Sequence, residues 1–153
     1  LHCSPTGSIE RVICALLENT SARKVPMVPT WLSPTQVRLI PIADRHKPVV
    51  EEYAQELNRA CIRTDMDDRE ESVNRKVRMA GMDWVPYVAV IGDREAERGT
   101  LTVTVRRLSD PQKPYKTEMS VQDLIATVKK ETEGMPYRPL YTPVRLSQKP
   151  RFI

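Results

Sequence analysis

The stretch that decides the fold is Tyr87-Val88-Ala89-Val90-Ile91, which is followed by Gly92-Asp93. A short continuous apolar run that ends at a turn is typical of a strand buried on both faces of a sheet. Two similar runs precede it, at 37–43 and at 62–66, and each is followed by a segment with helical spacing. The order strand, helix, strand, helix, strand predicts an α/β fold with parallel strands and right-handed crossovers.

The two crossover segments carry the apolar periodicity of helices that cover a sheet. Pro48 stands at a first-turn position, where proline is tolerated because it needs no hydrogen-bond partner for nitrogen. The apolar residues at helical spacing are Val50, Tyr53, Ala54 and Leu57 in the first segment, and Val73, Val77, Ala80 and Trp84 in the second.

Downstream of the parallel unit, the pattern changes to alternation. Residues 101–106 alternate apolar and polar side chains, as a half-exposed strand does, and 115–118 can pair with them across a proline-containing turn. The fold class is therefore α/β, with a mixed sheet of about five strands and flanking helices. Ser120 can cap a further helix, and Gly134 can end it.

The segments outside this unit are of two kinds. Residues 8–19 predict an amphipathic helix with Ser8 as N-cap, and the apolar face of that helix needs a cover. Residues 20–34 carry three prolines and no periodicity, which predicts a linker. The last segment has four prolines and predicts an extended tail that is either packed or disordered. We therefore expect three parts, 1–30, 31–134 and 135–153.

Composition limits the partners and the compartment. The chain has 24 Lys and Arg against 20 Asp and Glu, and the net charge of +4 leans toward an anionic partner. The three cysteines have no metal or redox spacing, which favours the cytoplasm. No apolar stretch approaches the roughly 20 residues that span a bilayer, so we expect no membrane partner. The chain opens without an initiator Met, and we expect it to be a fragment.

Three stretches together resemble the class II aminoacyl-tRNA synthetases and, among them, the threonyl-tRNA synthetases. They are His2 to Arg11 (HCSPTGSIER), Trp31 to Val37 (WLSPTQV), and Pro86 to Glu95 (PYVAVIGDRE). The ending 136–151 is similar to the archaeal members. The resemblance implies that a helix from the end of a catalytic domain precedes an anticodon-binding domain. The parent enzyme would be a homodimer that charges tRNA(Thr) with threonine.

The resemblance also implies roles for four residues near the N-terminus. Arg11 would bind ATP phosphates, Gly7 and Ser8 would line the amino-acid pocket, and His2 would be one of three zinc ligands. The other zinc ligands and sequence motifs of such an enzyme would lie upstream. We therefore expect ATP, magnesium and zinc only in the intact enzyme, no cofactor on this chain, and no catalysis by it alone.

The segment Arg69 to Arg78 carries the candidate anticodon site. On a helix, Glu71, Asn74, Arg75 and Arg78 would share one polar face. Carboxylate and guanidinium groups suit the edges of unstacked RNA bases, and threonine anticodons share a G and a U at their second and third positions. By resemblance, Glu71 and Arg78 match the base-reading residues.

Two positions depart from that family's pattern: Pro41 replaces a common asparagine, and Thr104 a common arginine that Arg106 could replace. Four further basic residues could touch phosphates: Arg38, Arg45, His46 and Lys47.

Plainer interpretations stay open. The polar face could be a solvated surface whose Glu71–Arg75 ion pair contributes only about 0.2–0.5 kcal/mol. The chain could also belong to a non-catalytic editing or accessory protein that contains this domain. A third possibility is a protein-interaction module, which predicts no preferential affinity for RNA.

Overall fold

A five-stranded mixed sheet forms the centre of the molecule, and its strand order is β2-β1-β3-β4-β5. The computed structural model describes residues 7–150. The strands β2, β1 and β3 are parallel, whereas β4 and β5 run antiparallel to their neighbours, so the predicted mixed sheet is confirmed. The strands are β1 (Val37–Pro41), β2 (Thr64–Met66), β3 (Tyr87–Ile91), β4 (Thr100–Val105) and β5 (Lys116–Ser120).

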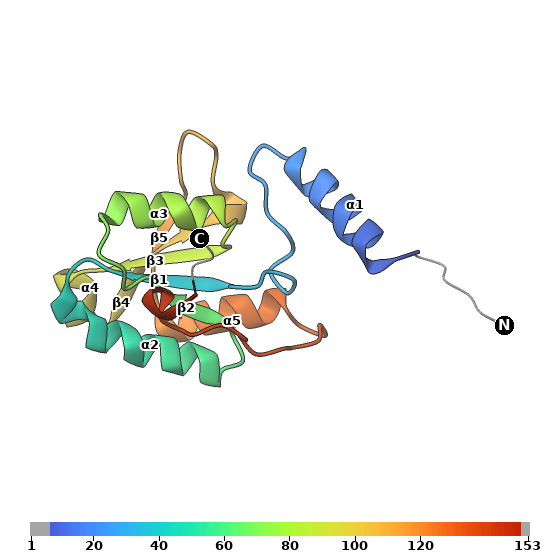
Figure 1. The fold of residues 1–153 in the computed structure, drawn as a ribbon. Coiled ribbons are helices and arrows are strands. Elements are labelled where there is room, and N and C mark those ends of the chain that lie inside the picture. The colour runs from blue at the N-terminus through green and yellow to red at the C-terminus, as the bar shows by residue number, and fades with distance from the viewer. Residues whose placement is uncertain (1–6, 151–153) are drawn as a thin grey trace.

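Helices cover both faces of the sheet. In Figure 1, α3 lies on one face, and α2 and α5 lie on the other, while α1 stands away from the sheet. Three 3₁₀ turns, at 44–46, 106–108 and 146–148, complete the secondary structure of the described residues. The helices are α1 (Ile9–Ser21), α2 (Lys47–Arg59), α3 (Val73–Met82), α4 (Asp93–Arg98) and α5 (Val121–Glu131).

The core has two layers because both faces of the sheet are apolar. The larger cluster joins the sheet to α2 and α5 and includes the fully buried Leu39, Leu57 and Leu124. The smaller cluster lies under α3 and includes Ile40 and Ala80. Neighbouring residues of one strand thus serve opposite layers, as the alternation of side chains in a strand requires. Burial on both faces accounts for the continuous apolar runs in the sequence.

Local signals place several helix ends. The Ser120 Oγ accepts a hydrogen bond from the Asp123 N–H (3.1 Å), and the Asp123 carboxylate accepts one from the Ser120 N–H (3.2 Å). This reciprocal cap begins α5 at the predicted residue. Gly134, at φ 73, lies just beyond the end of α5, in the left-handed region where glycine is favoured.

Three expectations about helices are wrong or incomplete. The segment 69–78 is not one helix, because Ser72 is the N-cap of α3 and residues 69–72 form a turn before it. Trp84 lies beyond α3, at φ 54, and is half-buried rather than part of an apolar stripe. Sequence analysis missed α4, whose six residues are too few to show a periodic pattern.

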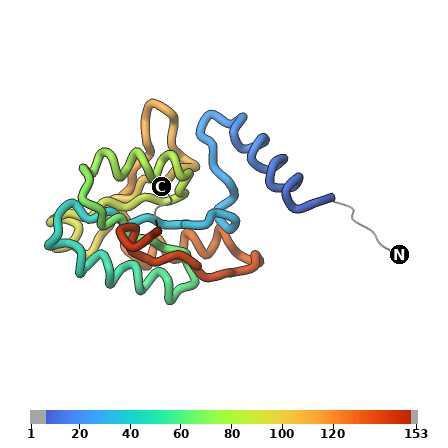
Figure 2. The backbone as a smooth tube through the Cα atoms, in the orientation of Figure 1, coloured from blue at the N-terminus to red at the C-terminus, as the bar shows by residue number. Residues whose placement is uncertain are grey.

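The C-terminal tail is ordered against the edge of the sheet. The Met66 N–H donates to the Val144 carbonyl (2.8 Å), and Arg145 pairs with Glu51 of α2 (2.6 Å). The tail therefore covers the outer edge of β2, which would otherwise expose unpaired backbone groups. Figure 2 shows this last segment running beside α2.

The linker packs on the domain, whereas α1 does not. Met27 and Thr30 are buried, and the Thr30 hydroxyl donates to Glu131 at the end of α5 (2.7 Å). On α1, Ile9 and Val12 remain 71% and 47% exposed, so nothing in residues 7–150 covers the apolar face of this helix. No helix among the described residues is long and apolar enough to cross a membrane.

Candidate nucleic-acid interface

A polar cleft of about 660 Å³ opens at the carboxyl end of β1. Its walls are residues 41–44 after that strand, Lys47 of α2, and residues 69–72 with the first turn of α3. The carboxyl ends of parallel strands are where ligands bind in open α/β sheets, because the helices that follow begin there. The order of elements in the sequence therefore creates this cleft.

Glu71 and Arg75 meet at the mouth of the cleft. The Arg75 guanidinium contacts the Glu71 carboxylate at 3.2 Å, although Glu71 lies before the helix and Arg75 lies within it. The Ser72 Oγ accepts a hydrogen bond from the Arg75 N–H (3.3 Å), so the cap of α3 lies between these two residues. The Glu71–Arg75 ion pair, which was also expected of a merely solvated surface, is therefore present. It also presents one acceptor group and one donor group side by side.

A buried ion pair holds the turn that carries Glu71. The Arg69 guanidinium donates two hydrogen bonds to the Asp67 carboxylate, at 2.8 and 2.7 Å, and the Asp67 N–H donates to the Leu39 carbonyl of β1 (2.9 Å). Burial alone would raise the pKa of Asp67, but the hydrogen bonds and the charge of Arg69 outweigh it, so this pKa lies below its usual value. The ionised pair holds the turn at Asp67, whose backbone N–H is bonded to β1.

The other predicted anticodon residues do not gather in the cleft. Asn74 and Arg78 are exposed on α3, outside the cleft lining. Arg106 lies beyond β4 at the opposite end of α3, where its Nε donates to the Pro26 carbonyl (2.6 Å). Thr104 and Arg106 line one pocket, and Arg106 holds the linker there; that Arg106 replaces an arginine at position 104 stays a prediction.

The basic residues around β1 are occupied by carboxylates. Arg45 donates to both oxygens of Asp93, and the buried His46 accepts the Ala43 N–H at Nδ1 (3.2 Å). The proton of His46 is therefore on Nε2, which donates to Asp93 (2.9 Å). The hydrogen bonds that Asp93 accepts from Arg45 and His46 lower the pKa of Asp93 to about 2. Lys47 pairs with Asp44 at 2.7 Å.

Arg38, considered above as a phosphate contact, is buried instead. It is 4% exposed and is bound by Asp65 and Asp83. Its guanidinium donates to Asp65 through Nε and Nη2 and to Asp83 through Nη1, so these carboxylates occupy the positions that a phosphate would take.

Sequence analysis missed Lys76, which also lines the cleft. Lys76 is 5% exposed, and it follows Val73 by three residues and precedes Ala80 by four. These spacings place a lysine on the apolar face of α3. A lysine at an apolar position of a helix is the sequence signal that could have identified Lys76.

The residues assigned to catalysis lie at the start of α1. Gly7, Ser8 and Arg11 are exposed, and the Arg11 side chain folds back toward Gly7, whose φ is 72. His2 lies outside the described residues. The described part of the chain holds no group of three metal-binding side chains, and a single exposed guanidinium does not enclose a nucleotide. These residues alone do not fit zinc or ATP.

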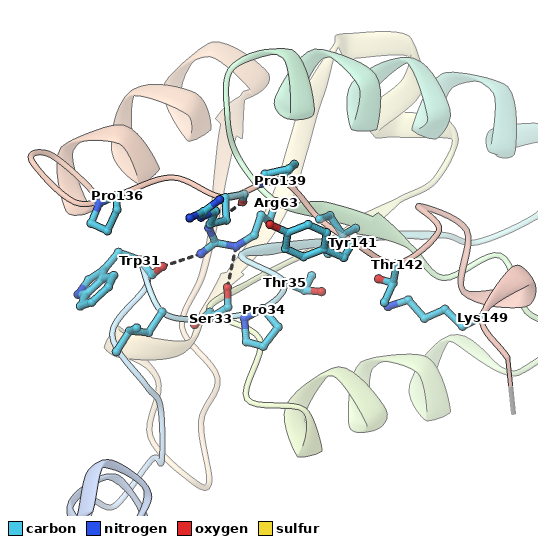
Figure 3. Close-up of a pocket in the computed structure, with 13 residues that line it drawn as sticks. Trp31, Ser33, Pro34, Thr35, Arg63, Pro136, Pro139, Tyr141, Thr142 and Lys149 are labelled. Carbon is cyan, nitrogen blue, oxygen red and sulfur yellow. Dashed lines mark hydrogen bonds between the residues drawn. The ribbon is translucent and has the colours of Figure 1, made fainter. Parts of the chain in front are cut away.

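A second cavity, of about 610 Å³, lies between the start of the domain and the tail. Figure 3 shows Arg63 at its centre, with its guanidinium directed at backbone carbonyls. Arg63 donates to the carbonyls of Trp31 (2.7 Å), Ser33 (3.0 Å) and Arg138 (3.3 Å). This arginine joins three segments and has few donors left for a ligand.

Comparisons with known proteins agree with this architecture. Residues 36–131 match the family described as "Anticodon binding domain". The chain is 65% identical over 153 residues to a threonine–tRNA ligase of Methanosphaerula palustris and 54% identical over 156 residues to that of Methanocaldococcus jannaschii. These alignments cover 100% and 99% of this chain but only 25% of each relative. The chain thus spans about a quarter of the length of these relatives.

Solved structures give the same fold. The RNA-binding domain of threonyl-tRNA synthetase from Cryptosporidium parvum superposes with a TM-score of 0.69 at 24% identity, over 87% of this chain and 30% of that one. Prolyl-tRNA synthetase from the same organism gives 0.67 at 23% identity, over 78% of this chain and 25% of that one. The matched family extends from the first strand of the sheet to the last residue of α5, so the chain belongs to the anticodon-binding domain family.

Proposed function

We propose that this chain reads the anticodon of tRNA(Thr) as part of a threonine–tRNA ligase. The observation that carries the proposal is the cleft at the carboxyl end of β1, where Glu71 and Arg75 offer an acceptor and donors at the capped start of α3. The similarity of the whole chain to one quarter of the length of threonine–tRNA ligases supports this choice of tRNA.

The chemistry of the cleft suits an unstacked base. The Glu71 carboxylate can accept hydrogen bonds from N1 and N2 of guanine, and a guanidinium can donate to O6 and N7. The exposed Arg78 and Asn74, one turn apart on α3, can contact the flanking nucleotides or their phosphates. Single-strand readout of this kind gives sequence preference, and phosphate contacts add affinity.

The remaining parts of the chain fit a larger enzyme. We place residues 1–30 at the end of a catalytic domain whose other parts would cover the apolar face of α1. Within such an enzyme Arg11 would face ATP, Gly7 and Ser8 would line the amino-acid pocket, and His2 would be one zinc ligand. In this proposal the whole enzyme is a cytoplasmic homodimer that uses ATP with magnesium. The relatives' names favour it over an editing or accessory protein.

Binding measurements test the proposed function. We expect the chain to bind a stem-loop with a threonine anticodon about 10-fold more tightly than one whose central G is changed to A, since one lost bidentate contact costs about 1–3 kcal/mol. Fluorescence anisotropy at physiological salt measures both affinities. Equal affinities would contradict anticodon readout, and no affinity for either RNA would favour a protein-interaction module.

A further inference from the structure

The cleft contains four cationic side chains, and three of them are bound to carboxylates. These pairs are Lys47 with Asp44 (2.7 Å), Arg69 with Asp67 (2.7 Å) and Arg75 with Glu71 (3.2 Å). Lys76 is the fourth. Within residues 7–150, no group forms a hydrogen bond or an ion pair with its Nζ.

The position of Lys76 makes this absence informative. The residue is 5% exposed, yet its Nζ is not one of the fully buried, unpartnered side-chain atoms of residues 7–150, so a buried stem presents the ammonium group to the cleft. Charged groups lie near Lys76, but none in residues 7–150 forms an ion pair with its Nζ. Lys47 is the main cause of the lowered pKa of Asp44, and Lys76 contributes to it; Lys76 also adds to the effect of Arg69 on the pKa of Asp67. Its three donor hydrogens are free for a ligand in the cleft.

The charges of the cleft favour a neutral ligand. Three carboxylates line it, those of Asp44, Glu70 and Glu71, and the buried Asp67 holds Arg69. Four negative groups thus balance the four cations, so a phosphate would gain little net attraction. A base edge that combines a ring N–H with a neighbouring carbonyl would satisfy both a carboxylate and an ammonium group. Guanine and uracil present this combination, whereas adenine and cytosine do not.

We propose that Lys76 donates a hydrogen bond to the carbonyl oxygen of the central guanine of the anticodon and is a specificity-determining residue; this inference rests on the function proposed above. The Glu71 carboxylate accepts the ring N–H of the same base edge. The two side chains act as one reader, since the turn 69–72 and the first turn of α3 carry both of them. A base without the carbonyl offers the ammonium group no acceptor.

A double-mutant cycle between protein and RNA tests the proposal. The protein variants are Lys76→Met, which keeps the length but removes the charge, and Lys47→Met as the matched control, since Lys47 lines the same cleft but is 36% exposed and paired with Asp44. The RNAs are the threonine anticodon stem-loop and two derivatives, one with the central G changed to A and one with the third-position U changed to C. Affinity is measured at several salt concentrations.

We expect Lys76→Met to weaken binding of the unmodified stem-loop about 10-fold, as for loss of a charged hydrogen bond. We expect it to have little effect on the derivative with A in place of the central G, to weaken the U-to-C derivative as much as the unmodified stem-loop, and to leave the salt dependence unchanged. Lys47→Met should weaken all three RNAs slightly and equally. Thermal unfolding checks that Lys76→Met is folded, and Lys76→Gln serves as a second neutral variant.

Two results would overturn the assignment of Lys76. An equal loss for all three RNAs, with the salt slope reduced by about one, would identify a phosphate contact instead. Unchanged affinity would show that Lys76 does not touch the RNA. Both results leave the preference of the wild-type chain intact. If the wild-type chain itself shows no preference for the threonine anticodon, the proposed function and this inference fail together.

Discussion

Replacement of Asp65 by alanine is expected to lower the free energy of unfolding by about 3–5 kcal/mol, because it leaves a buried charge without its main partner. Asp65 is completely buried and accepts two hydrogen bonds from Arg38, at 2.8 and 2.9 Å, and one from Thr35, at 3.0 Å. Lys149 of the tail also contacts it, at 3.2 Å. Arg38 is 4% exposed, so water cannot replace the lost carboxylate.

Urea unfolding followed by circular dichroism measures this change. The matched control is Asp83→Ala, which removes the other carboxylate bound to Arg38 but at a position that is 50% exposed. The control should cost at most about 1 kcal/mol, as exposed ion pairs do. If the free energy of unfolding falls by the same small amount in both variants, the buried pair of Arg38 in β1 and Asp65 in β2 does not stabilise the fold.

Replacement of Glu71 by alanine is expected to remove the preference for the central guanine of the anticodon. The carboxylate is 32% exposed at the cleft and is positioned by Arg75 and by the cap of α3. Its loss should weaken binding of the threonine stem-loop about 10–100-fold, because a good bidentate contact to a base discriminates by about 1–3 kcal/mol. The stem-loop with A in place of the central G should bind the variant and the wild-type chain alike.

The neighbouring acid gives a control of equal charge. Glu70 lines the same cleft, so Glu70→Ala removes one negative charge from the same surface. Electrostatics alone predicts that both variants bind every RNA slightly more tightly. Readout by Glu71 predicts that only Glu71→Ala loses the discrimination between G and A. Identical behaviour of the two variants in anisotropy measurements would reduce Glu71 to a surface charge.

Local sequence patterns were sufficient for the fold. The strand 87–91 matches its predicted bounds because both of its faces are packed, and its apolar run in the sequence ends where the strand ends. The cap at Ser120 was predictable because its partner, Asp123, lies three residues away. The same rule applied to Ser72 would have begun α3 at Val73 and placed Glu71 before the helix.

The interactions that were not predictable join residues far apart in the sequence. Arg38 looked like a surface cation because Asp65 and Asp83 lie 27 and 45 residues away. The sequence left open whether the tail is packed or disordered because its partners lie far away in the chain: Ser147 donates its N–H (2.9 Å) and its hydroxyl (2.6 Å) to Asp68. No periodicity within a segment records contacts of this kind.

The most direct test of the central claim is to map the RNA contact on the chain itself. Adding the threonine anticodon stem-loop to ¹⁵N-labelled chain and following the backbone amide resonances shows which residues change environment. The account predicts the largest shifts at the cleft, at Ala43, Glu71, Ser72 and Arg75. Shifts concentrated at 31–35 and 138–142, around the cavity in Figure 3, would contradict it.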